Sequence, residues 1–280
     1  MTRREILTSS AVALSAAPAF GQEERVQRKG RIKQGVCNGV FGREMAFEDR
    51  CRHAARLGAT GFDLMPEERW PILKKHGLIP TMVPGAGNIK DALNRKENHE
   101  RLLADMQSNL KKAAAFGCPN VITFSGNKAG MGEAEAIDNC VLFLNKVKAQ
   151  AEDLGTNICM EYLNSKVNHP DYQFDHMSFG VEVCKRVNSP RVKILYDMYH
   201  VQIMEGDVIR MMRAHIQHIG HFHTAGNPGR HEFDDTQEMN YRGIANAIAD
   251  LGFKGWVSHE YSPLKDPLKS LDEALRICDV

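Results

Sequence analysis

The chain has 280 residues, of which 42% are hydrophobic and 25% are charged, a balance typical of a globular protein with a sizeable core. Its 36 basic and 35 acidic side chains leave a net charge of +1. This charge excludes the broad basic field expected of a nucleic-acid-binding protein. The length permits either two ordinary domains or one α/β barrel, because such a barrel needs about 250 residues.

Residues 1–22 have the pattern of an export signal. Arg3 and Arg4 precede a run of small and apolar residues, 9–20, which contains an A-x-A cleavage pattern. This arrangement predicts a signal of the twin-arginine type, and the run is shorter than the roughly 20 residues of a membrane-spanning helix. We therefore expect an exported protein of the periplasm or cell envelope, with residues 23–31 as a linker. A disordered N-terminal tail is the alternative.

Eight short β-rich runs follow this segment, and each is followed by an amphipathic helical pattern. The predicted strands are 32–37, 60–65, 78–83, 120–125, 157–162, 192–197, 218–223 and 255–260. One predicted helix, residues 98–116, repeats apolar residues at helical spacing and ends at Gly117. Eight strand-then-helix units predict one α/β domain, a single (β/α)₈ barrel over residues 32–280. A doubly wound sheet would use fewer strands and carry a phosphate-binding glycine motif, which the sequence lacks.

The cysteines show no spacing that indicates chemistry. They are odd in number, contain no CxxC pair and fall mostly in apolar stretches, so we expect buried thiols rather than disulfides or a nucleophile. They stand at positions 37, 51, 118, 140, 159, 184 and 278.

The last four predicted strands each end in a residue that binds metals, namely Glu161, Asp197, His223 and Glu260. The carboxyl ends of barrel strands meet at one mouth, so these side chains could converge on one divalent ion. The oxygen-rich set favours Mn²⁺, Mg²⁺ or Co²⁺, and Zn²⁺ is the next choice. Each acid taken singly could instead cap a helix. Four such residues on consecutive strands favour the ion.

Three further polar residues lie near these strand ends. His221 and His223 are two residues apart and so point to the same side of the strand, and we assign His223 as the ligand and His221 as a neighbour on the substrate side. Arg230 follows a turn sequence that could hold its guanidinium over the mouth, with a surface salt bridge as the alternative. His200, three residues after Asp197, is either structural or substrate-facing.

Four segments carry a resemblance to a known family. The chain resembles the hydroxypyruvate isomerase branch of the xylose-isomerase-like TIM barrels, which also includes the ketose 3-epimerases, over nearly all of the mature chain. The matching segments are Glu161-Tyr162-Leu163-Asn164, Tyr196-Asp197-Met198-Tyr199-His200, residues 220–232 and residues 255–261.

The resemblance implies one divalent metal at the four strand-end residues, and substrate contacts from His200 and Arg230. It also implies that Glu161 and Glu260 flank the reacting carbon. His223 stands where typical hydroxypyruvate isomerases have glutamine and ketose epimerases have histidine, and Gly226 stands where the isomerases have aspartate. These departures imply retained metal chemistry with a changed substrate.

We therefore expect a divalent-metal-dependent isomerase or epimerase of a keto-sugar or hydroxypyruvate-like compound, acting through an enediolate with Glu161 and Glu260 as catalytic groups. The alternatives are a lyase or hydratase of 3-keto-sugars or glycosides, and a non-catalytic sugar-binding barrel. A metal-dependent phosphodiesterase would need more histidines and a basic groove. The expected partner is a small carbohydrate or keto acid, without nucleic acid or a stable membrane span. A homo-oligomer is left open, because no stretch marks an interface.

Overall fold

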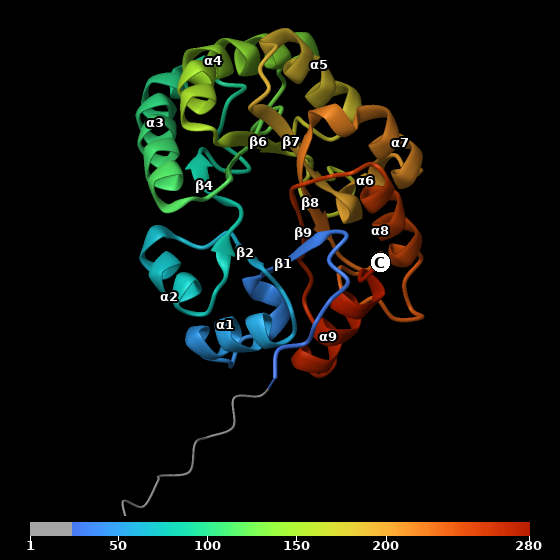
Figure 1. Ribbon diagram of the computed structural model, residues 1–280. Coiled ribbons are helices and arrows are strands. Elements are labelled where there is room, and N and C mark those ends of the chain that lie inside the picture. The colour runs from blue at the N-terminus through green and yellow to red at the C-terminus, as the bar shows by residue number, and fades with distance from the viewer. Residues whose placement is uncertain (1–23) are drawn as a thin grey trace, which may run out of the picture.

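The computed structural model describes residues 24–280, and the expected signal sequence lies outside the described residues. Parallel strands form the centre of the molecule and helices surround them (Figure 1). The strands are β1 (Lys33–Cys37), β2 (Gly61–Asp63), β3 (Ile79–Pro80), β4 (Val83–Ala86), β5 (Asn120–Thr123), β6 (Asn157–Glu161), β7 (Val192–Asp197), β8 (Ile219–Thr224) and β9 (Trp256–His259). The helices are α1 (Phe47–Arg56), α2 (Trp70–Lys75), α3 (His99–Phe116), α4 (Glu133–Leu154), α5 (Met177–Val187), α6 (Met198–Met204), α7 (Val208–His215), α8 (Tyr241–Asp250) and α9 (Pro267–Ile277).

The strands follow the order β3-β2-β1-β9-β8-β7-β6-β5-β4, and every pair is parallel. The pairing of β1 with β9 joins the first and last strands of the chain. The sheet therefore curls into a nearly closed barrel, and the predicted single (β/α)₈ TIM barrel is confirmed. Among the strands of residues 24–280, β3 and β4 are the two ends of this order, and they are consecutive in the chain.

The third predicted strand, residues 78–83, is wrong as a continuous element. It is divided into β3, which pairs with β2, and β4, which pairs with β5. Pro80 and Pro84 explain the division, because proline has no amide hydrogen and cannot donate to a strand ladder. The side-chain amide of Asn120, in β5, donates to the carbonyl oxygen of Thr81 at 2.7 Å. This hydrogen bond joins β5 to the residues between β3 and β4.

The helix expected at residues 98–116 is confirmed as α3. Leu102, Met106 and Leu110 lie on its buried face, and Gly117 ends it with a left-handed backbone (φ 86°). All seven cysteines are buried and free, as expected from their spacing. Among residues 24–280, no helix combines the length and the apolar character that crossing a membrane requires.

The stretch expected to be a linker contacts the barrel from Arg25 onward. The amide of Val26 donates to the carbonyl oxygen of Arg56 at 2.8 Å. The guanidinium of Arg28 donates to the carbonyl oxygen of Leu57 at 2.8 and 3.0 Å and pairs with Asp272 at 2.6 Å. These contacts join the segment before β1 to the end of α1 and to α9.

We predict that Arg28→Ala lowers the free energy of unfolding by about 1–3 kcal/mol, since it removes charge-assisted hydrogen bonds to a partly buried carbonyl. Arg31→Ala is the matched control, because its pair with Asp250 is exposed on both sides and should contribute at most about 0.5 kcal/mol. Urea denaturation of the two variants beside the wild type measures the difference. Equal effects of the two substitutions would contradict a structural role for this segment.

Candidate metal centre

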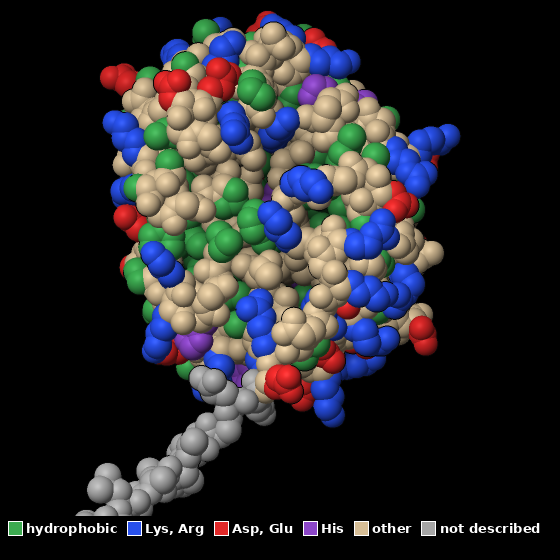
Figure 2. Space-filling model, viewed as in Figure 1, with side chains coloured by type: hydrophobic (Ala, Val, Ile, Leu, Met, Phe, Trp, Pro, Cys, Tyr) green, Lys and Arg blue, Asp and Glu red, His purple; other side chains and the backbone are tan. Residues whose placement is uncertain are grey.

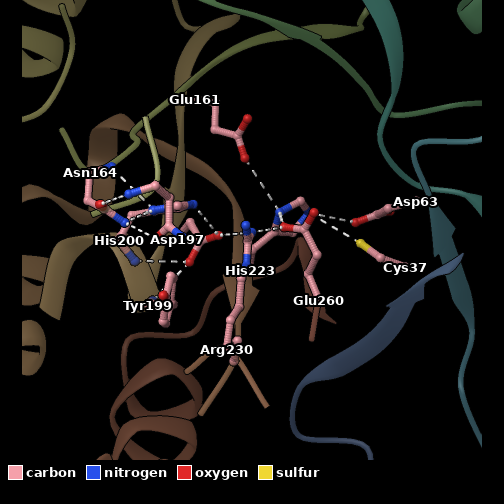
Figure 3. Close-up of polar contacts among 12 residues, drawn as sticks. Cys37, Asp63, Glu161, Asn164, Asp197, Tyr199, His200, His223, Arg230 and Glu260 are labelled. Carbon is pink, nitrogen blue, oxygen red and sulfur yellow. Dashed lines mark hydrogen bonds and ion pairs between the residues drawn. The ribbon is translucent and has the colours of Figure 1, made fainter. Parts of the chain in front are cut away.

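Four strands bring their carboxyl ends together at the mouth of the barrel. Glu161 ends β6, Asp197 ends β7, His223 is the penultimate residue of β8, and Glu260 directly follows β9. The register pairs Asp197 with His223 across β7 and β8. Figure 3 shows the four side chains pointing toward one another. One ligand atom from each lies within 4.8 Å of the others, so the structure brings the sequence-predicted set together.

The imidazole of His223 lies at the centre of this set. Its Nδ1 is 2.8 Å from Oε2 of Glu260 and 3.8 Å from Oε1 of Glu161. The ring is fully buried, and the Glu161 side chain is only 8% exposed, whereas that of Glu260 is 25% exposed. Glu260 is therefore the member of the set that faces the opening.

Asp197 uses its two oxygens for different purposes. Oδ1 accepts hydrogen bonds from the backbone amides of Tyr199 (2.9 Å) and His200 (3.3 Å), and so caps the N-terminus of α6. Oδ2 faces the centre, 3.0 Å from Nη2 of Arg230. The sequence left helix capping and a place in the candidate metal set as alternatives for this residue. Asp197 does both, one with each oxygen of its carboxylate.

Arg230 reaches the centre from the loop between β8 and α8. Its Nη2 lies 3.0 Å from Asp197 and 2.8 Å from Glu260, and its guanidinium lies 5.3 Å from the centroid of the Tyr199 ring (Figure 3). Both carboxylate partners belong to the candidate metal set. The alternative of a surface salt bridge is therefore wrong for this arginine, because its loop turns the side chain into the mouth.

His200 is held in one tautomer by Asn164, at the start of the loop after β6. The backbone amide of Asn164 donates to Nδ1 of His200 at 3.2 Å, so Nδ1 accepts and Nε2 carries the hydrogen. Burial lowers the pKa of this imidazole to about 4. Nε2 is buried without a hydrogen-bond partner and lies 3.6 Å from Oδ2 of Asp197. His200 therefore offers a neutral N–H donor beside the carboxylate set.

His221 lies one layer deeper in the barrel than the mouth. It is fully buried, and its Nε2 is 2.6 Å from Oδ2 of Asp63, a residue that the sequence analysis did not identify. The same oxygen lies 3.2 Å from Nε2 of His223. His221 therefore contacts Asp63 and lies behind His223. It is not at the opening, where a substrate contact was expected.

Asp63 could have been found by the rule that identified the others, because it is the last residue of β2. The expected strand ran two residues further, to Met65, and so placed this acid inside the strand instead of at its end. Cys37, the last residue of β1, was also missed, and its Sγ lies 3.9 Å from Nε2 of His223. Cys37 also ends the predicted strand 32–37, but it was set aside with the other cysteines as a buried thiol.

The ionisation of the acids follows from burial and from neighbouring charges. Burial raises the pKa of Glu161, and the nearby carboxylate of Glu260 raises it further. Burial would also raise the pKa of Glu260, but Arg230 and His223 lower it below the ordinary value. Burial opposes ionisation of Asp63 as well, yet His221 and His223 hold its pKa well below the usual range.

The residues present fit a divalent cation. Three carboxylates and an imidazole surround one point, and the buried Nδ1 of His223 makes no well-directed hydrogen bond despite its closeness to Glu260. Two other groups of potential ligands occur among residues 24–280, one formed with Cys37 and one with Asp63, and both include His223. The groups therefore overlap at one imidazole and do not form the histidine-rich multinuclear cluster expected of a phosphodiesterase.

A cavity of about 300 Å³ opens beside this set. Its lining includes Cys37, Leu64, Met65, Arg230 and Glu260. This volume is at the lower end for ligand pockets and suits a small molecule. Cationic side chains elsewhere are interspersed with other residues on the face shown in Figure 2 and form no continuous basic groove there.

Two bacterial proteins are similar to this chain in sequence. A protein of Cupriavidus necator named 2-oxo-tetronate isomerase is 35% identical over 46% of this chain, and the match spans about half (48%) of that relative's length. A protein of Pectobacterium atrosepticum with the same name is 28% identical over 79% of this chain and 88% of its own length.

The solved structures include a crystal structure described as AP endonuclease, family 2, from Brucella melitensis. It is 26% identical, covers 86% of this chain and 96% of its own chain, and superposes with a TM-score of 0.78. The family model described as xylose isomerase-like TIM barrel matches residues 44–279, which contain all four strand-end ligand candidates. The chain therefore belongs to the xylose isomerase-like TIM barrel family.

Proposed function

We propose that this protein is a divalent-metal-dependent isomerase or epimerase of a small hydroxy-carbonyl compound. The observation that carries the proposal is the convergence of Glu161, Asp197, His223 and Glu260 beside the cavity at the barrel mouth. The isomerase names of the two bacterial relatives support the same class of reaction. The substrate class is a keto-sugar or a small keto acid of the 2-oxo-tetronate or hydroxypyruvate type.

The four ligand candidates would hold one ion, for which Mn²⁺, Mg²⁺ or Co²⁺ suit the oxygen-rich set and Zn²⁺ is the next choice. When bound, such an ion supplies positive charge at the substrate oxygens, where negative charge develops as the proton α to the carbonyl leaves.

The two glutamates perform the proton transfers. One carboxylate accepts the proton from the carbon next to the carbonyl, and the electron pair of that C–H bond moves toward the carbonyl oxygen to give an enediolate. Return of a proton to the neighbouring carbon gives an isomer, and return to the same carbon on its other face gives an epimer. Glu161 and Glu260 lie close enough to serve one substrate, because ligand atoms of both fall within 4.8 Å of each other.

The surrounding side chains orient the substrate. The Nε2–H of His200 faces the set from one side, and the guanidinium of Arg230 faces it from the loop after β8. Both are hydrogen-bond donors and suit the hydroxyl, carbonyl or carboxylate oxygens of the proposed substrates. Leu64 and Met65 supply an apolar wall of the cavity, which helps to exclude water from the reacting carbon.

We predict that the wild type retains about one divalent ion per chain, as the single convergent set requires. Glu161→Gln and His223→Ala should lose this ion and also the exchange of substrate α-hydrogen for solvent deuterium. Metal analysis gives the first result. Mass spectrometry of a panel containing keto-sugars, hydroxypyruvate and 2-oxo-tetronate in D₂O gives the second.

Glu152→Gln is the control for these variants, because Glu152 lies at the exposed end of α4, where its carboxylate accepts a hydrogen bond from the hydroxyl of Ser189 at 2.6 Å. It should keep both metal and exchange. Metal-free wild-type protein that still exchanges the α-hydrogen would overturn the proposed metal dependence. A wild type that binds the ion but exchanges no panel member, and releases an aglycone from a 3-keto-glycoside, would identify a lyase instead.

We also predict a compensation between Arg230 and the ion. Without an ion, Arg230 neutralises Asp197 and Glu260, so Arg230→Met should lower the melting temperature of the metal-free protein. Added Mn²⁺ should raise the melting temperature of this variant more than that of the wild type, because the ion replaces the missing positive charge. Arg210→Met, which removes an exposed ion pair, is the control and should show neither effect. Equal responses of the variant and wild type to Mn²⁺ would contradict this coupling.

We propose in addition that residues 1–22 direct export. The support is the paired Arg3-Arg4 followed by a short apolar run with an A-x-A pattern. N-terminal sequencing of protein recovered from the periplasm of the native host should find a chain that begins after this segment, and Lys substitution of both arginines should retain the precursor in the cytoplasm. Recovery of soluble cytoplasmic wild-type protein that keeps Met1 would refute export.

A further inference from the structure

The buried carboxylate of Asp63 contacts the back of the candidate metal centre. Oδ2 lies 2.6 Å from Nε2 of His221 and 3.2 Å from Nε2 of His223, and Oδ1 accepts a hydrogen bond from the hydroxyl of Thr81. All four residues have less than 1% of their surface exposed. A carboxylate can remain in such an interior only if donors surround it, and here three donors do so.

The position of Asp63 decides which nitrogen of His223 is available to the mouth. The two nitrogens of the ring face opposite sides, with Nε2 toward Asp63 and Nδ1 toward Glu161 and Glu260 (Figure 3). A neutral imidazole carries one hydrogen and one lone pair. When an ion takes the lone pair of Nδ1 in place of the hydrogen that Nδ1 can share with Glu260, the one remaining hydrogen is on Nε2, where the acceptor-only carboxylate of Asp63 holds it.

We propose that Asp63 is a positioning residue for the metal ligand His223, which it holds by accepting the Nε2 hydrogen so that Nδ1 presents its lone pair to the ion. This inference rests on the proposed metal-dependent function and extends it to a residue on the opposite side of the barrel. A carboxylate behind a metal-bound histidine fixes the orientation of the ring and raises its basicity.

The backbone around Asp63 holds its carboxylate in a fixed position. Asp63 pairs with Cys37 in the register of β1 and β2, and Thr81 is held beside it by the hydrogen bond from its amide to the carbonyl oxygen of Phe62 at 3.2 Å. The next residue, Leu64, has a left-handed backbone (φ 61°), and its amide donates to the carbonyl oxygen of Met82 at 2.7 Å. The carboxylate therefore projects inward from a strand end that is bonded on both sides.

Asp63, His221 and His223 could instead bind a second ion of their own, since they also form a potential ligand group. The hydrogen-bond geometry favours positioning, because Asp63 already accepts from His221 at 2.6 Å and from Thr81, which leaves little space between the ligand atoms. The two possibilities differ in the number of ions bound per chain, so titration distinguishes them.

The test is metal binding by the full chain after removal of metals with a chelator. Mn²⁺ is titrated and free Mn²⁺ is followed by electron paramagnetic resonance, and Zn²⁺ affinity is measured by competition with a chelating dye. We expect Asp63→Asn, which preserves shape but removes the charge, to weaken binding of either ion by about 10- to 100-fold with one site per chain retained.

Asp175→Asn is the matched control. Asp175 is also a buried carboxylate bonded to a histidine, with Oδ1 2.8 Å from Nδ1 of His176, but it belongs to none of the potential ligand groups in residues 24–280. Its substitution should lower the melting temperature without changing the affinity for Mn²⁺ or Zn²⁺. The comparison separates a general loss of stability from an effect on the ligand.

A second readout needs no metal. Nitrogen-15 NMR of the metal-free wild type should show a hydrogen on Nε2 of His223, besides the one that Nδ1 can share with Glu260, with the signals identified by their absence from His223→Ala. Asp63→Ala should lose the hydrogen on Nε2 and keep the one on Nδ1. Asparagine has nearly the size of aspartate, so Asp63→Asn leaves no cavity, whereas Asp63→Ala does. If Asp63→Ala does not fold, the metal affinity of Asp63→Asn still decides the question.

Unchanged affinities of Asp63→Asn would overturn the positioning role while the metal site itself stands. Two ions in the wild type and one in Asp63→Asn would show a second metal site and overturn it as well. A wild type that binds neither Mn²⁺ nor Zn²⁺ would remove both this inference and the metal dependence of the proposed function.

Discussion

The repulsion among carboxylates in a space with little water is the constraint on which this site depends. Parallel strands of a barrel end at the same mouth, so β6, β7 and β9 bring Glu161, Asp197 and Glu260 to one place whether or not their charges favour it. Three buried negative charges at such distances are stable only beside positive charge or donors. The rest of the site is an arrangement of such groups around them.

The chain supplies part of that compensation itself. The amides at the start of α6 take one oxygen of Asp197, and Arg230 takes the other together with an oxygen of Glu260. Glu161 has a more distant basic partner, Nδ1 of His223 at 3.8 Å, and burial together with the carboxylate of Glu260 raises its pKa. A cation-binding function is consistent with this incomplete neutralisation.

The sequence predicted the barrel and the mouth well for a physical reason. Strands β6 to β9 are apolar runs that end in a polar residue, and their predicted ends fall within one residue of the observed ones. Period and strand-end chemistry are local properties that a sequence displays directly. The prediction failed at residues 78–83, where Pro80 cannot donate to a strand ladder and the chain changes its pairing partner from β2 to β5.

Contacts between distant segments were beyond the sequence. The alternation of His221 and His223 indicates that both point inward, but their common partner, Asp63, lies 158 residues before His221. Only the closure of β2, β1, β9 and β8 brings this acid across the barrel to the histidines. The place of Arg230 likewise depends on the path of a long loop, and that path has no periodic signal.

The division of residues 79–86 into β3 and β4 has a consequence for motion. Neighbouring strands from β6 to β9 pair at three or four register positions each, with one register shift between Ile194 and Leu195, so the strands that carry the four ligand candidates can separate only by breaking several hydrogen bonds together. Residues 79–86 form β3 and β4 in succession and pair with β2 and β5 at only two or three register positions each, so local opening of this wall breaks fewer hydrogen bonds. The charged set thus lies on the side of the barrel with more strand pairing, whereas Leu64 and Met65, which follow β2, lie on the side where fewer hydrogen bonds oppose local opening.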